Sequence, residues 1–177
     1  MMKSPADLEQ TVQAGKEAFE SARYQAAADH FRAAAEEYSA LGRTADAAEQ
    51  SSNLSVALLK LGRGQEALAA AIGTDEIFSA AGDVRRQGIA LNNQAAAYEQ
   101  LGRVEEALSA YERSAELLGK VGENGLRAEV LKAAAGLQLR RGKLADSGIR
   151  MMAVLEAKER PSMFERILKY ALRVVQR

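Results

Sequence analysis

The sequence predicts an all-α protein, built as a solenoid of antiparallel helical hairpins. Three observations lead to this fold class. The phrase "LGRGQEA" at 61–67 returns forty residues later as "LGRVEEA" at 101–107, and a period of 20 to 50 residues is typical of solenoids. Strong helix formers such as Ala, Leu, Glu, Arg and Gln dominate the chain. The only two prolines, Pro5 and Pro161, lie near the ends, so long helices can run between them.

Regularly spaced glycines predict where the helices end. One series recurs every forty residues and a second has the same period, twenty residues out of phase. The two series are Gly62, Gly102 and Gly142, and Gly42, Gly82 and Gly122. A glycine after a helical run supplies the left-handed conformation that stops a helix. Two stops in each period predict two helices per repeat, with a break at every one of these six glycines.

The expected elements follow in order along the chain 1–177, read as one domain. The helices are predicted to pair as 5–21 with 24–40, 44–60 with 64–80, 83–101 with 104–120, and 123–141 with 144–158. These pairs make repeats at about 5–41, 43–81, 83–121 and 123–158, followed by a single helix at 161–176. Ser4 and Asp7 form an N-cap signal for the first helix. Gly73 falls inside the expected helix 64–80; an interior glycine costs about 1 kcal/mol, and we expect the helix to tolerate it without a break.

Small residues recur where the two helices of each hairpin should approach closely. They stand five positions after the first glycine series, or after Ala22, which takes the place of the glycine in the first repeat. These small residues are Ala27, Ala67, Ala107 and Ser147. A large side chain there would push the helices apart. Phe31 and Tyr111 follow four residues later on the same helix face, where they can fill the widening gap.

With Tyr98 before Gly102, then Ala107 and Tyr111, the segment 91–118 resembles the tetratricopeptide repeat. The resemblance extends from about Leu8 to Ala157. The forty-residue period is similar to repeats in Pins-type polarity adaptors, kinesin light chains and the soluble NSF attachment proteins. The repeat of this chain departs from the common 34-residue tetratricopeptide repeat in three ways: its period is longer, the usual Trp is missing, and the closing Pro is missing.

The resemblance implies a right-handed superhelix, in which the first helix of each pair lines a concave groove that binds a peptide or helix of another protein. By the family pattern, the candidate groove residues are Gln13, Lys16, Glu49, Ser52, Asn53, Asn92, Asn93 and Lys132. Gln13, Asn53 and Asn93 share one repeat position, where an Asn in peptide-binding members holds the ligand backbone. A carboxamide suits that role because it both donates and accepts hydrogen bonds. The alternative is that these amides only bond a neighbouring helix.

The last predicted helix, 161–176, is strongly amphipathic, with basic residues opposite an apolar stripe. Phe164, Ile167 and Leu168 are the residues expected to carry its contacts. The helix can cap the solenoid, whose terminal repeats must cover an exposed apolar face. Docking to a partner or a sister chain, and lying on an anionic membrane, stay open as alternatives.

The amino-acid composition argues against several classes of function. The 24 basic and 24 acidic side chains balance, so no nucleic-acid partner is expected. The chain has no cysteine and only one histidine, His30, so no enzyme, metal site or cofactor is expected. With no secretory signal or membrane-spanning stretch read, a cytoplasmic location is expected.

The sequence therefore predicts a non-catalytic protein–protein interaction module: an adaptor, scaffold or assembly factor. The main alternative is a structural protein that self-associates, as a homo-oligomer, through its ends or its last helix. A peptide-sensing regulator is disfavoured because the chain has no room for a separate output domain.

Overall fold

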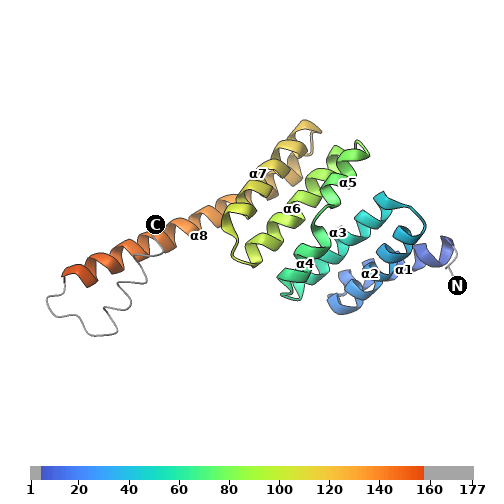
Figure 1. The fold of residues 1–177 in the computed structure, drawn as a ribbon, viewed down its shortest axis with the longest axis horizontal. Helices are drawn as coiled ribbons and strands as arrows, with labels where there is room; N and C mark the ends of the chain where they lie inside the picture. The colour runs from blue at the N-terminus through green and yellow to red at the C-terminus, as the bar shows by residue number, and fades with distance from the viewer. Residues whose placement is uncertain (1–4, 158–177) are drawn as a thin grey trace. The chain divides into compact units, whose positions relative to one another are not determined.

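The structure, a computed structural model, describes the backbone of residues 5–157 and the side chains of residues 6–142. Every regular element in this part of the chain is a helix, which confirms the all-α hairpin class (Figure 1). The elements are α1 (Pro5–Glu20), α2 (Tyr24–Ala40), α3 (Thr44–Lys60), α4 (Gly64–Ala71), α5 (Thr74–Ala80), α6 (Val84–Gln100), α7 (Val104–Lys120) and α8 (Asn124–Ala157).

Helices that are adjacent in sequence also pack against each other in space. α1 pairs with α2, α3 with the two short helices α4 and α5, and α6 with α7. α3 also contacts α2 and α6, so each hairpin is joined to the next. The first helices of the three hairpins are thus α1, α3 and α6, and the second helices are α2, α4–α5 and α7.

One turn geometry recurs at the predicted spacing of twenty residues. At Gly62 the backbone φ is +74°, the Gly62 amide donates to the Leu59 carbonyl at 3.1 Å, and the Arg63 amide donates to the Leu58 carbonyl at 3.0 Å. These two bonds define the Schellman helix stop. The same left-handed conformation occurs at Gly42, Gly82, Gly102 and Gly122, and at Ala22 without a glycine. The helix breaks predicted at these five glycines are therefore confirmed.

The small residues predicted for the close helix approaches are buried wherever their side chains are described. Ala27, Ala67 and Ala107 are fully buried, and Phe31 and Tyr111 are buried behind them. Ser147 lies outside the residues whose side chains are described. An apolar cluster continues through all three hairpins and includes Ala18, Phe31, Leu58, Leu68 and Ala97. This shared core holds the first-helix surfaces of α1, α3 and α6 in place.

The expectation for Gly73 was wrong, because the helix predicted at 64–80 is broken there. Ile72 has an extended backbone (φ −59°, ψ 133°), Gly73 is left-handed (φ +82°), and α5 begins at Thr74. The break frees carbonyls at the end of α4. One of them, on Ala71, accepts from the Thr74 hydroxyl at 2.7 Å and from the Gln94 amide at 3.1 Å. A side chain from another helix therefore compensates the break, which local sequence could not indicate.

The predicted break at Gly142 was also wrong, since α8 runs through it and residues 123–158 do not form the fourth hairpin. Each true turn has an apolar residue four positions before its left-handed residue. These residues are Ala18, Tyr38, Leu58, Phe78, Tyr98 and Leu118. The equivalent residue before Gly142 is Gln138, which is exposed and offers no apolar anchor. Without that anchor, a glycine inside a helix costs only about 1 kcal/mol and the helix continues.

The chain divides into two compact units, Met1–Ala135 and Gly136–Arg177. How far a single solenoid continues beyond Ala135 stays a prediction. The predicted helix 161–176, with Phe164, Ile167 and Leu168, lies outside the described residues. Within the part of the chain that was searched, no helix is both long enough and apolar enough to cross a bilayer.

Candidate protein-binding site

The first helices of the hairpins present two hollows, which together we call the first-helix face. The smaller, of about 180 Å³, lies between α1 and α3, with Phe31 of α2 behind it. Its other lining residues are Lys16, Phe19, Glu20, Asn53 and Val56. Two aromatic rings and a valine therefore form an apolar floor, with an ammonium, a carboxylate and a carboxamide at the edge.

The larger hollow, of about 390 Å³, lies between α6 and the first turns of α8. Tyr111 and Leu118 of α7 line it from behind. The remaining lining residues are Arg85, Ile89, Asn92, Ala96, Leu126, Glu129, Val130 and Ala133. The wall is mostly apolar, and its few polar groups are Arg85, Asn92 and Glu129 together with the tyrosine hydroxyl.

The structure brings three of the predicted groove residues into these hollows. Lys16 and Asn53 line the smaller one and Asn92 lines the larger one. The Asn53 side chain is half-buried, and its amide donates to Gln50 Oε1 at 3.3 Å. Gln13 and Lys132 are exposed outside both hollows, and the Gln13 amide donates to Glu17 Oε1 at 3.0 Å.

The other predicted groove residues join helices to one another. Asn93 is only 7% exposed, and its amide lies 3.5 Å from the carbonyl of Ser52, which is itself buried. Asn93 therefore links α6 to α3, which agrees with the alternative that these amides bond a neighbouring helix. Glu49 is half-buried and accepts from Arg86 Nη1 at 3.1 Å, also between α3 and α6.

Arg86 also anchors the start of α6. Asp83 caps this helix, since its carboxylate accepts from the Arg86 backbone amide at 2.8 Å and from Arg86 Nε at 2.6 Å. The backbone amide and then the guanidinium hold the pKa of Asp83 below its ordinary value. The carboxylate in turn raises the pKa of Arg86. Asp83 and Arg86 thus stabilise the first turn of α6, the helix that carries Ile89 and Asn92.

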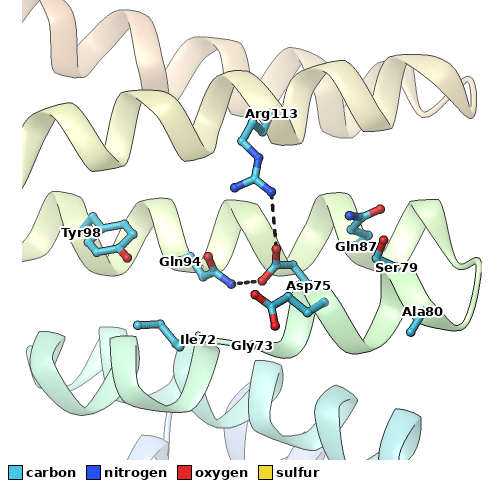
Figure 2. Close-up of a pocket in the computed structure, with 10 residues that line it drawn as sticks. Ile72, Gly73, Asp75, Ser79, Ala80, Gln87, Gln94, Tyr98 and Arg113 are labelled. Atoms are coloured by element: carbon cyan, nitrogen blue, oxygen red, sulfur yellow. Dashed lines mark hydrogen bonds and ion pairs between the residues drawn. The ribbon is translucent and has the colours of Figure 1, made fainter.

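Sequence reasoning missed a third hollow, of about 590 Å³, on the opposite set of helices. It lies between α5 and α7, along α6, where Asp75, Gln94 and Arg113 converge (Figure 2). A comparison of the repeats contains a signal that could have revealed this hollow. Asp75 and Gln94 stand forty residues after Ala35 and Leu54, so two polar residues replace two apolar ones. Among the residues searched, no group of three or more His, Cys, Asp or Glu side chains could hold a metal ion.

Comparison with known proteins identifies the family. No curated protein matches the chain. Residues 4–173 match the model of the family described as soluble NSF attachment protein, SNAP. The match covers almost the entire chain and agrees with the forty-residue helical hairpins and with the resemblance drawn from their repeats. The chain belongs to the soluble NSF attachment protein family.

Proposed function

We propose that the protein is a non-catalytic adaptor that binds an amphipathic peptide or helix of a partner protein along the first-helix face. The observation that supports this most directly is the larger hollow between α6 and α8. Its apolar wall and sparse polar groups suit the apolar side of an amphipathic segment. Asn92 can bond the backbone or a polar side chain of that segment at the edge.

The family assignment supports a role in protein attachment, because its members are described as attachment proteins. That description supplies one partner to test, NSF itself. We further propose that the smaller hollow, with Lys16 and Asn53, extends the binding surface along α1 and α3. The smaller hollow lies on α1 and α3 and the larger one on α6 and α8, and the main apolar cluster joins α1, α3 and α6, which supports one continuous binding surface.

Paired substitutions test this proposal. Asn53→Ala with Asn92→Ala should greatly weaken partner capture, while the far-UV circular dichroism and melting curve stay unchanged. The measurement is affinity purification from native lysate followed by mass spectrometry, then isothermal titration with purified NSF or with the recovered partner. The matched control is Gln25→Ala with Gln65→Ala, which removes two amides from the second helices α2 and α4. If both double variants capture every partner equally well, the first-helix face is not the binding site.

A further inference from the structure

The break between α4 and α5 makes the second hairpin unlike its neighbours. The second helices of the other two hairpins, α2 and α7, each run unbroken for 17 residues. At the break Ile72 is 57% exposed. Hollows lie on both sides of it: the one of about 590 Å³ toward α7, and one of about 560 Å³ toward α2. We call the first of these the Gly73 hollow.

The floor of the Gly73 hollow is a buried polar network. Asp75 and Gln94 are each only 8% exposed. The Gln94 amide donates to Asp75 Oδ1 at 2.6 Å and to the Ala71 carbonyl at 3.1 Å. Gln94 thereby holds one carboxylate oxygen in place. The other oxygen, Oδ2, points toward α7 (Figure 2).

A guanidinium already lies at the mouth of this hollow. Arg113 Nη2 is 3.7 Å from Asp75 Oδ2, a separation longer than a hydrogen bond. The Arg113 side chain is 60% exposed, whereas that of Asp75 is 11% exposed. An exposed guanidinium at this distance gains little from the carboxylate. A nearly buried carboxylate, by contrast, gains much from a close charge-assisted hydrogen bond. Arg113 therefore shows that the site attracts a guanidinium, although Arg113 itself forms no hydrogen bond with Asp75 Oδ2.

We propose that the Gly73 hollow binds an arginine side chain of a partner protein. The incoming guanidinium bonds Asp75 Oδ2 in place of Arg113, and Ile72 packs against the apolar residues that flank this arginine. Charge complementarity supports the choice, since Glu76 lines the same hollow and Glu36 lines the hollow on the other side of Ile72. Arginine fits better than lysine because its planar fork can bond a carboxylate oxygen and a second acceptor together.

This site is separate from the first-helix face. Its walls come from α5 and α7, and α6 contributes Gln87, Gln94 and Tyr98 from the side away from Ile89 and Asn92. The protein could therefore hold one partner on each face. The inference does not depend on the function proposed above, and the two can fail independently.

A labelled peptide gives a direct test. The probe is a fluorescein-labelled peptide with a single arginine between two leucines, compared with the same peptide carrying neutral citrulline. Fluorescence polarisation should show binding of the arginine peptide to the full chain and none of the citrulline peptide. Arg113→Ala removes the internal competitor and should tighten binding by roughly threefold to tenfold. Asp75→Asn should abolish it.

The matched controls use an exposed ion pair of similar length, Arg32 with Asp29, whose nitrogen and oxygen are 3.8 Å apart. Arg32→Ala and Asp29→Asn change the net charge equally and should leave peptide affinity unchanged. So should Asn53→Ala with Asn92→Ala, which separates this site from the first-helix face. The proposal is overturned if Arg113→Ala binds no more tightly than Arg32→Ala. Because Arg113 makes no buried hydrogen bond, that comparison is decisive even if Asp75→Asn does not fold.

Discussion

At the scale of single residues, the repeated turn depends on one backbone conformation. Gly42, Gly62, Gly82, Gly102 and Gly122 have φ between +71° and +75°, whereas Ala22 holds the same place with φ +55°. The left-handed region brings the Cβ of an L-residue too close to its own carbonyl, at a cost of roughly 1–2 kcal/mol. The first turn therefore carries strain that the later turns avoid.

Ala22→Gly should consequently stabilise the protein, although it removes a methyl group. We expect the free energy of unfolding to rise by about 1 kcal/mol, measured by urea denaturation followed by circular dichroism. The reverse substitution, Gly62→Ala, is the control, since an added Cβ there would meet no neighbouring group within 4 Å. It should lower the free energy of unfolding by a similar amount through strain alone. Equal stabilities for both variants and the parent would contradict this account.

Asp83 makes one helix start depend on pH. Its pKa is lowered by the Arg86 backbone amide and guanidinium, so the charged carboxylate is favoured more in the folded state than in the unfolded state. The stabilisation is therefore fully present above the ordinary Asp pKa, and is lost as the pH falls through the lower, folded pKa.

Asp83→Ala should lower the free energy of unfolding by about 1 kcal/mol at pH 7, because α6 loses its cap. The difference between parent and variant should shrink as the pH is lowered below about 4. Urea unfolding at a series of pH values measures this. A difference that stays constant down to pH 2 would show that the carboxylate charge has no part in it.

At the scale of elements, α4 and α5 are held in their broken geometry by a side chain of α6. Gln94 and Thr74 both donate to the Ala71 carbonyl, and Gln94 also bonds Asp75. The equivalent residues of the preceding repeat, Ala35 on α2 and Leu54 on α3, are apolar, and α2 is continuous. A buried polar pair thus accompanies the break, and an apolar pair accompanies the intact helix.

Gln94→Leu should cost about 1–3 kcal/mol, because the buried Asp75 carboxylate loses its hydrogen-bond donor. Adding Asp75→Ala should recover part of that loss, since the orphaned carboxylate is then gone as well. A double-mutant cycle by urea denaturation measures the coupling between the two residues. Strictly additive effects would mean that the two side chains do not stabilise the break together.

At the scale of the whole molecule, stability should reside in the unit Met1–Ala135. The main apolar cluster runs from Ala18 on α1 to Ala97 on α6, through all three hairpins. In a solenoid each repeat contacts only its neighbours, so stability is close to a sum of local terms.

A chain ending at Ala135 should accordingly stay helical and unfold in a single transition. If helix 161–176 does not cap the solenoid, the melting temperature of this shortened chain should lie within a few degrees of that of the full chain, and if the helix is a cap it should be clearly lower. Thermal circular dichroism on both chains compares them. If the shortened chain is unfolded at 25 °C, residues beyond Ala135 contribute to the folding core.

The C-terminal prediction belongs to the same scale. If helix 161–176 caps the solenoid, Ile167→Asp with Leu168→Asp should lower the melting temperature and the solubility, because an apolar patch is exposed. If it mediates self-association instead, the melting curve should be intact. In light scattering, the mass of the parent should then rise with protein concentration, whereas the mass of the double variant should stay constant.

Most of the helices, five of the six glycine breaks, the burial of the small residues and a resemblance that includes the matched family were predictable from the sequence alone. The reason is physical: a Schellman turn is specified by about six consecutive residues, and the repeat then copies it. Tertiary structure decided which carboxamide stays open and which joins two helices, since Asn92 and Asn93 differ only in what packs beside them. It also decided that α4 and α5 separate at Gly73 while α8 continues through Gly142. A glycine permits both outcomes, and the choice depends on contacts from elsewhere in the chain: the Gln94 amide at Gly73, and the missing apolar anchor at Gln138.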